Sequence, residues 1–151
     1  MPDIIISDTS CLIILKKINQ LEILTKLYSK VWVTPEVLKE FGEELIGIEV
    51  RGATDNNLIQ AFSRLVDLGE ASALALAVET KNSVLILDDK KARKLAETLG
   101  LATTGTLGVL LKAKQSGYIK SMKEILISLN ATDFRISDRI VNEILKEAGE
   151  I

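Results

Sequence analysis

Acidic side chains follow two predicted strands of this 151-residue chain, at the point where each strand ends. Asp8 follows the apolar run Ile4–Ile6 and one serine, and the pair Asp88 and Asp89 follows the apolar run Val84–Leu87. In an open parallel sheet, ligands bind outside the carboxyl ends of the strands. If these two strands are neighbours, their carboxylates converge at one rim of the sheet.

Two glutamates are placed to join this group. Glu40 lies about a turn and a half into a helix that we expect after a second strand, Val31–Val33, because Thr34 and Pro35 are typical of a helix start. Glu70 lies in the first turn of an alanine-rich helix that leads to the third strand. These glutamates and the strand-end aspartates therefore have the positions needed to meet at one rim.

The type of these residues points to metal chemistry. Several carboxylates at close range do not all stay ionised unless a cation neutralises them. Oxygen ligands with room for water suit Mg²⁺ or Mn²⁺. One or two such ions activate water and stabilise an in-line displacement at a phosphodiester. The acids therefore predict a metal-dependent hydrolase.

Each acid also has a structural explanation, which the sequence leaves open. Asp8 can cap the turn that follows it, and Glu70 can simply favour the dipole of its helix. Glu40 can be an ordinary exposed glutamate. Asp88 and Asp89 can form a turn and a helix N-cap. Asp88 is closer to the strand and Asp89 closer to the next helix, so either can be the fourth acid of the group.

The composition excludes other hydrolytic chemistry. No histidine occurs and Cys11 is the only cysteine. The chain therefore has no Ser-His-Asp triad, Cys-His dyad, histidine-ligated zinc, internal disulfide or iron–sulfur cluster. With 19 basic and 21 acidic residues the net charge is −2, which does not by itself indicate a nucleic-acid binder. The first half is the more acidic, which is compatible with an acidic pocket beside a basic surface.

The order of elements predicts an α/β fold of one domain. Apolar runs at residues 4–6, 31–33, 84–87 and 101–103 alternate with helical patterns, which indicates a parallel sheet covered on both faces. Residues 42–54 hold three glycines, and we expect them to form a loop over one end of the fold. No apolar run is long enough to span a membrane, and we expect a cytoplasmic protein.

Taken in order, these segments resemble the PIN domain, the nuclease module of many prokaryotic type II toxins of the VapC type. The resemblance covers nearly the whole chain. It rests on the order of four motifs, which are Ile4–Ser10 with Asp8, Val33–Glu40, Gly69–Ala77 with Glu70, and Ile86–Arg93 with the paired aspartates. One archaeal and bacterial branch of the superfamily is similar in its Asp-Asp-x-x-Ala-Arg form, in Thr104–Leu110 and in a C-terminal extension that includes Phe134–Ser137.

The resemblance implies a three-layer α/β/α sandwich with a central parallel sheet of four or five strands. It implies one domain over residues 1–151, whose C-terminal helical extension covers about 118–151. It also implies a Mg²⁺- or Mn²⁺-dependent endoribonuclease. The metal-binding tetrad would be Asp8, Glu40, Glu70 and either Asp88 or Asp89. Glu70 stands where such toxins more often have aspartate, which leaves its direct contact with the metal open. The expected supporting residues are Thr9, Ser10, Thr104 and Thr106.

Basic residues in the second half are candidates for holding the RNA backbone. They are Lys90, Lys91, Arg93, Lys94, Lys112 and Lys114, and the plain alternative for them is a solvated helix face. The expected partners are an RNA substrate, a cognate antitoxin where one exists, and a second copy of the chain in a homodimer. The alternative function is a catalytically weak or inactive PIN-like module that binds nucleic acid or protein.

Overall fold

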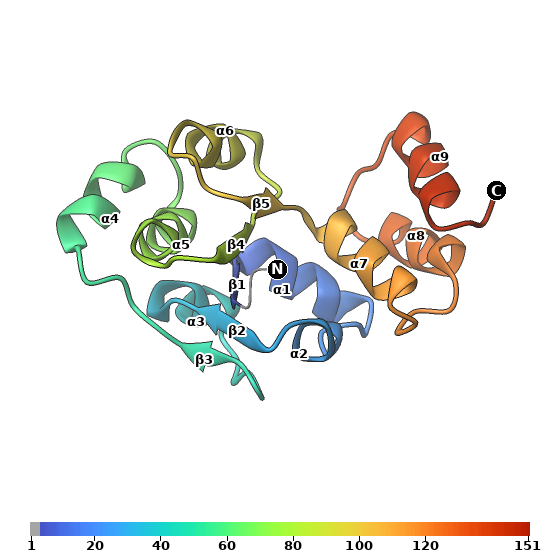
Figure 1. The fold of residues 1–151 in the computed structure, drawn as a ribbon, viewed down its shortest axis with the longest axis horizontal. Helices are drawn as coiled ribbons and strands as arrows, with labels where there is room; N and C mark the ends of the chain where they lie inside the picture. Colours follow the sequence, from blue (N-terminus) through green and yellow to red (C-terminus); the bar gives the residue numbers. More distant parts are fainter. Residues whose placement is uncertain (1–3) are drawn as a thin grey trace.

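The computed structural model describes residues 4–151 and arranges five parallel strands in one sheet (Figure 1). The order across the sheet is β3-β2-β1-β4-β5. β1 lies in the centre, with β2 on one side and β4 on the other, and Ser7 at its end pairs with Ile86 of β4. The parallel α/β fold expected from the sequence is therefore confirmed. The strands are β1 (Ile4–Ser7), β2 (Lys30–Val33), β3 (Glu49–Val50), β4 (Ser83–Ile86) and β5 (Thr103–Thr104).

Helices connect the strands and then extend the fold at its C-terminal end. Most of them begin at an aspartate, serine or threonine whose side chain accepts a hydrogen bond from the first turn. Within residues 4–151 the helices are α1 (Thr9–Lys17), α2 (Ile23–Leu27), α3 (Pro35–Phe41), α4 (Asn56–Ser63), α5 (Leu68–Glu79), α6 (Lys90–Thr98), α7 (Thr106–Gln115), α8 (Met122–Asn130) and α9 (Asp138–Glu147).

The sheet is covered on both faces by separate apolar clusters. Neighbouring residues of a strand point to opposite faces. Ile5 accordingly packs with α1, α2, α7 and α8, whereas Ile6 packs with α4, α5 and α6. In Figure 1 the last three helices lie together at the right of the sheet, beside α1 and α2. Ile144 of α9 belongs to the same buried cluster as Ile5. Residues 1–3 of the predicted domain lie outside the described residues.

Residues 42–54, which we expected to form only a loop, differ from that expectation. They contain the edge strand β3, in which Glu49 and Val50 pair with Trp32 and Val33. The side chain of Arg51 also lies over the Trp32 ring, 4.5 Å from its centroid. The sequence pattern missed this strand because both of its residues are exposed, so no apolar alternation marks it. No helix within residues 4–151 is long and apolar enough to cross a bilayer.

Candidate functional site

The sheet brings the ends of β1 and β4 together, and each end leads into an acid. From β1 the chain order moves outward to β2 and β3 on one side, whereas β4 and β5 lie on the other side. Such a point of reversal leaves a crevice at the carboxyl ends of the strands. Asp8 directly follows β1, and Asp88 follows β4 after one leucine. The expected adjacency of these two acid-bearing strands is therefore present.

Asp8 is the most deeply buried of the candidate acids, with 1% of its surface exposed. Its Oδ1 accepts a hydrogen bond from the Cys11 N–H at 2.9 Å, which caps α1. Its Oδ2 has no hydrogen-bond partner. Burial, together with the smaller effect of the charges of Asp88 and Glu70, raises the pKa of Asp8 to about 7. The nearby backbone N–H of Asp88 lowers the pKa of Asp8 slightly. It does not form a hydrogen bond with Oδ2 of Asp8.

Asp88 is held in place by Thr106, the first residue of α7. The Thr106 N–H donates to Oδ1 of Asp88 at 2.9 Å, and the Thr106 hydroxyl donates to Oδ2 at 2.5 Å. Gly105 leaves the necessary room, because a Cβ at that position would lie 2.9 Å from Oδ1 of Asp88. Thr106, which is fully buried, thus fixes both oxygens of the acid beside Asp8.

Glu70 and Asp89 lie next to this pair and also serve their own helices. Glu70 forms a capping box with Asp67, in which each side chain accepts a hydrogen bond from the backbone of the other. Burial raises the pKa of Glu70 to about 7, and the charges of Asp67 and Asp89 contribute. Asp89 accepts from the Ala92 N–H at 3.0 Å and caps α6. Asp67 is not among the acids expected from the sequence, although the spacing Asp-x-x-Glu is a signal for such a box.

Glu40 is turned toward the N-terminus of α5 rather than toward Asp8. Its Oε1 accepts a hydrogen bond from the Thr9 hydroxyl at 3.5 Å and lies against the backbone of Gly69, whose N–H partly lowers the pKa of Glu40. A Cβ on Gly69 would collide with this oxygen. Burial raises the pKa of Glu40, as does the nearby charge of Asp67. The charges that act on Asp8 are those of Asp88 and Glu70, so Glu40 lies at the edge of the acidic group.

A buried hydroxyl pair fixes α3 against α5, the helices that carry Glu40 and Glu70. Oγ1 of Thr34 and Oγ of Ser72 lie 2.6 Å apart. Because the Ser72 hydroxyl donates to the Gly69 carbonyl at 2.7 Å, the Thr34 hydroxyl donates to Ser72. Thr34 in turn accepts from the Val37 N–H and caps α3. The contact sets the relative position of the two glutamates.

Comparison with known proteins identifies the family to which this chain belongs. A family model described as a PIN domain matches residues 4–150. This chain belongs to the PIN-domain family. PIN domains are generally nucleases that act on nucleic acids and use divalent metal ions. No curated protein matches the chain.

Within this PIN domain, the acids present a donor set that fits a divalent cation. The buried Oδ2 of Asp8 lacks any hydrogen-bond donor, and the carboxylate of Asp88 lies close enough to disfavour its ionisation. No three Asp, Glu or Cys side chains in residues 4–151 are grouped closely enough to share one ion. Mg²⁺ is usually held by one or two carboxylates and keeps several waters, so Asp8 and Asp88 are sufficient as its protein ligands.

The other residues predicted to support the site or to bind RNA differ in their contacts and exposure. The hydroxyl of Thr104 contacts the Gly105 carbonyl and packs on Gly108 of α7. Arg93 donates to the Leu87 carbonyl at 3.4 Å, close to the acids. The exposed residues of this group are Ser10 in the first turn of α1 and Lys90, Lys91, Arg93 and Lys94 on α6.

Two of the predicted RNA-binding lysines have partners elsewhere. Lys112 lies over the Tyr28 ring at 4.5 Å, and Lys114 pairs with Glu150 and donates to the Lys120 carbonyl. Lys114 lies eight residues after Thr106 in α7, so it is about 12 Å along the helix from the residue that binds Asp88. Lys114 thus ties α7 to the C-terminal segment, and Lys112 ties α7 to Tyr28, which follows α2. Their contact with the RNA backbone stays a prediction.

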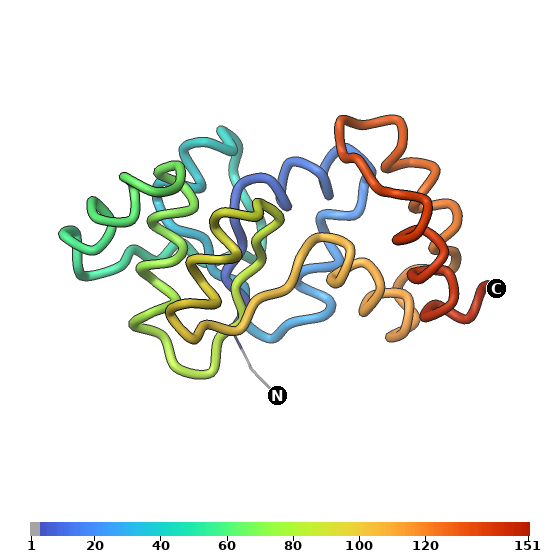
Figure 2. Tube along the Cα trace, turned by 90° about the horizontal axis from the view of Figure 1, so that it is seen from above, coloured from blue at the N-terminus to red at the C-terminus, as the bar shows by residue number. Residues whose placement is uncertain are grey.

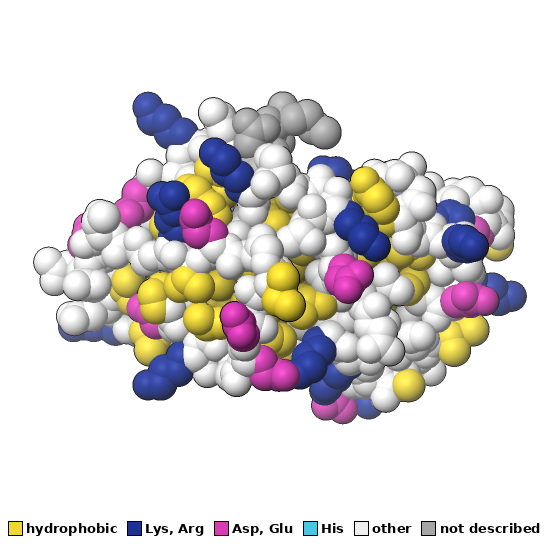
Figure 3. Space-filling view, turned by 90° about the horizontal axis from the view of Figure 1, so that it is seen from below, with side chains coloured by type: hydrophobic (Ala, Val, Ile, Leu, Met, Phe, Trp, Pro, Cys, Tyr) yellow, Lys and Arg dark blue, Asp and Glu magenta, His cyan; other side chains and the backbone are white. Residues whose placement is uncertain are grey.

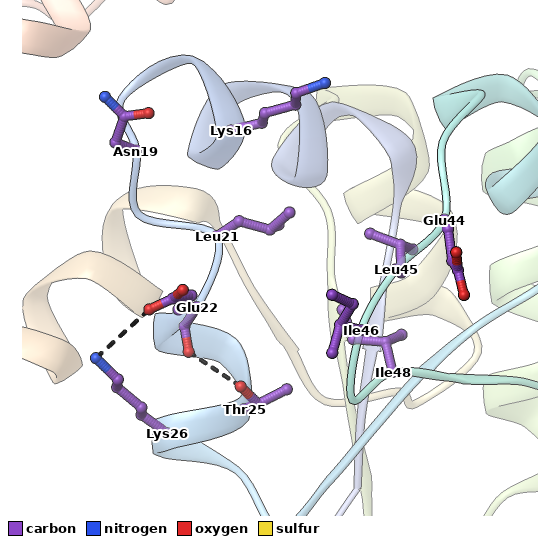
Figure 4. A pocket seen from close by; sticks show the side chains of 10 residues that line it. All are labelled: Lys16, Asn19, Leu21, Glu22, Thr25, Lys26, Glu44, Leu45, Ile46 and Ile48. Atoms are coloured by element: carbon purple, nitrogen blue, oxygen red, sulfur yellow. Dashed lines mark hydrogen bonds and ion pairs between the residues drawn. The ribbon is translucent and has the colours of Figure 1, made fainter.

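Cavity size alone does not identify the acidic site of this PIN domain. A hollow of about 660 Å³ lies between the α1–α2 turn and the segment at 44–48, and no candidate acid lines it (Figure 4). The face seen in Figure 3 carries scattered side chains of both charges around an apolar band. That face shows no continuous basic patch of the kind that marks a nucleic-acid surface.

Proposed function

We propose that this PIN domain is an endoribonuclease that hydrolyses RNA phosphodiesters with Mg²⁺ or Mn²⁺ bound by Asp8 and Asp88. The observation that carries the proposal is the buried Oδ2 of Asp8, which has no hydrogen-bond partner, in a carboxyl group whose pKa the charges of Asp88 and Glu70 help to raise. A buried carboxylate without a partner destabilises the fold unless a cation satisfies it. A site that retains such a group is therefore adapted to bind a cation.

The protein's own residues hold the acids in a fixed geometry. The Cys11 N–H engages Oδ1 of Asp8 and leaves Oδ2 free. Thr106 fixes both oxygens of Asp88. Glu70 and Asp89, each held by a helix cap, add negative charge beside the pair and can bind waters of the ion. The ion, when bound, supplies an activated water and neutralises charge on the phosphate.

The direct test is cleavage of a panel of single-stranded and structured RNAs in Mg²⁺, in Mn²⁺ and in EDTA. We expect cleavage by the wild-type protein with metal and a loss of about 100-fold or more in Asp8→Asn. The matched control is Asp138→Asn, since Asp138 lies in the first turn of α9, on the C-terminal helices. Equal cleavage by the wild type and Asp8→Asn contradicts the proposal.

A second measurement separates metal binding from cleavage. Isothermal titration calorimetry with Mn²⁺ should show binding to the wild type with a dissociation constant in the millimolar range or lower. It should show no binding to Asp8→Asn. Metal binding without cleavage of any RNA would instead favour the inactive binding module. Absence of metal binding to the wild type would remove the basis of the proposal, because the buried oxygen of Asp8 would then have another purpose.

We also propose that the protein acts as the toxin of a type II pair, is silenced by an antitoxin and forms a homodimer. The support for this finer assignment is the likeness of its four motifs to the VapC type. Induced expression in a bacterial host should arrest growth with the wild type and leave growth normal with Asp8→Asn. Size-exclusion chromatography with light scattering measures the oligomeric state, and a monomer at micromolar concentration contradicts the dimer.

A further inference from the structure

A second hollow, of about 220 Å³, lies between α1 and the segment that joins α8 to α9. Four residues of one face of α1 line it, and residues 132–134 close it from the other side. Figure 2 shows this connection, in orange and red, beside the far end of α1. The four residues of α1 are Ser10, Ile13, Ile14 and Lys17, whose spacing places them on one side of the helix.

This groove begins next to the candidate acids. Ser10 lies only two residues after Asp8, in the first turn of α1. At 1.5 Å per residue, the groove extends about 10 Å from Ser10 to Lys17. A strand bound with one phosphate at the acids therefore reaches the groove with an adjoining nucleotide.

The walls of the groove are apolar and its rim is polar. Ile13 is 38% exposed, Ile14 is half-buried, and the half-buried ring of Phe134 lies across from them. Within residues 4–151, the Ser10 hydroxyl, the Asp133 carboxylate and the Lys17 ammonium have no hydrogen-bond or ion-pair partner. The groove thus offers an aromatic surface, a free hydrogen-bond acceptor and an unpaired cation.

The loop that carries Phe134 and Asp133 is itself well fixed. The Thr132 hydroxyl donates to the Leu129 carbonyl at 2.6 Å and accepts from the Phe134 N–H at 3.1 Å. Arg135 donates to the Thr132 carbonyl at 3.3 Å and has no carboxylate partner among the described residues. Its unneutralised charge offsets that of Asp133 and favours an anionic ligand over a neutral one.

We propose that this groove binds one base of the RNA strand beside the scissile phosphate, with the base against Phe134, its polar edge at Asp133 and its phosphate at Lys17. The proposal rests on the proposed nuclease function and adds a subsite to it. Aromatic side chains bind bases of any sequence by stacking. At the exocyclic position a carboxylate accepts from the N4 amino group of cytosine, whereas uracil has there the acceptor O4 and keeps only its N3–H as a donor. The groove therefore prefers cytosine to uracil.

The test is fluorescence anisotropy with labelled octamers of cytidine and of uridine, in EDTA so that no cleavage occurs. We expect the wild type to bind the cytidine octamer about fivefold more tightly. Asp133→Asn should lose this preference, because an amide can donate to uracil as well as accept from cytosine. Since Asp133 is exposed, this variant leaves the fold intact.

Variants of the aromatic residue test the stacking itself. Phe134→Leu should weaken binding of both octamers about tenfold, and Phe134→Tyr should retain it. The matched control is Tyr118→Leu, an exposed aromatic on the α7–α8 connection that should change affinity less than about twofold. Thermal unfolding of each variant checks that Phe134→Leu, whose ring packs on the core, is still folded.

Three outcomes overturn the groove proposal: no affinity for either octamer, equal affinity for the two octamers in the wild type, or unchanged binding in both Asp133→Asn and Phe134→Leu. Its failure is distinct from that of the nuclease. Cleavage that depends on Asp8 while the groove variants bind normally leaves the nuclease intact and removes the subsite. Binding that depends on the groove, without cleavage in Mg²⁺ or Mn²⁺, supports the subsite and removes the nuclease.

Discussion

Two groups of carboxylates in this molecule are treated in opposite ways. Glu79 and Glu150, which we call the clasp carboxylates, each accept several hydrogen bonds at the start of a helix. Glu79 takes the N–H groups of Thr54 and Asp55, and Glu150 takes those of Met122 and Lys123. These backbone donors hold the pKa of both acids below the ordinary value.

The site carboxylates Asp8 and Glu70 show the reverse pattern. Each serves a cap at one oxygen, yet burial and neighbouring acids raise the pKa of both to about 7. Asp8 also keeps one oxygen with no donor. The difference teaches that capping alone does not separate structural acids from functional ones in this fold. The separating property is whether the protein supplies enough donors to satisfy the charge.

The largest expected contrast is in catalysis. Asp88→Asn should lower the rate of RNA cleavage about 10³-fold, which corresponds to about 4 kcal/mol, because it removes one of two proposed metal ligands. Glu150→Gln, which alters a clasp carboxylate, should leave the rate unchanged. The check is single-turnover cleavage at saturating Mn²⁺. A comparable loss of rate in both variants would remove the distinction between the two groups.

The next contrast is in the pH dependence of stability. Because the pKa of Asp8 is about 7 in the folded protein and 3.8 in a freely exposed aspartate, the folded state favours the protonated form. The resulting stability is fully present below pH 3.8 and is lost as the pH rises through about 7, by about 4 kcal/mol in total. Urea denaturation in EDTA from pH 4 to 8 measures it, and Asp8→Asn should make the curve less steep, with the remaining slope coming from Glu70.

Excess Mn²⁺ is the control for this pH dependence. A bound cation should restore stability to the wild type at pH 8 and leave Asp8→Asn unchanged. At that pH, without metal, the variant should be the more stable protein, because it carries no buried charge. A wild-type stability that rises between pH 4 and 7 would place Asp8 with the clasp carboxylates.

A smaller effect decides to which group Glu40 belongs. In Gly69→Ala the new methyl group displaces the Glu40 carboxylate from α5. We expect cleavage to fall about tenfold. The unfolding free energy should change by less than about 1 kcal/mol, since the helix propensity of alanine offsets one lost hydrogen bond. Gly52→Ala is the matched control, because its Cβ would meet Pro35 at an ordinary 3.7 Å. Unchanged cleavage would assign Glu40 a purely structural role.

The smallest effect concerns the clasp carboxylates themselves. Glu79→Ala removes the acceptor for the backbone that precedes α4 and should lower the free energy of unfolding by about 1 kcal/mol. It should not alter cleavage. Urea denaturation at pH 7 measures the loss, and Glu147→Ala on the exposed side of α9 is the control. A change in the cleavage rate larger than twofold would show that Glu79 influences the site carboxylates.

Several features of the site could be predicted from the sequence because they depend on short segments. Asp8 and the pair Asp88 and Asp89 are found by their place after apolar runs, and the sheet confirms that these runs are adjacent. The sequence leaves open which member of the pair joins Asp8. The capping positions of Asp8 and Asp89 follow equally from local pattern. Whether Asp8, Glu70 and their neighbours bind metal stays a prediction.

Other features depend on contacts that no local pattern records. Glu40 turns to α5 because Gly69, which is 29 residues away in the chain, lacks a side chain at that place. The hydrogen bonds from Thr106 to Asp88 join residues 18 positions apart, and they depend on the register in which β4 and β5 pair. The edge strand β3 is too short and too exposed to leave an apolar signature.

Every residue of helix α5 from Gly69 to Ala77 is buried except the half-buried Glu70, whereas α9 buries only Ile144. Amide protons in such a central helix exchange with deuterium only when the whole molecule opens, and those of a peripheral helix exchange through local opening. Deuterium uptake should therefore be slowest in α5 and fast in α9. The turn that carries Glu70 is thus anchored to the slowest-exchanging segment, and the C-terminal helices can fluctuate without displacing it.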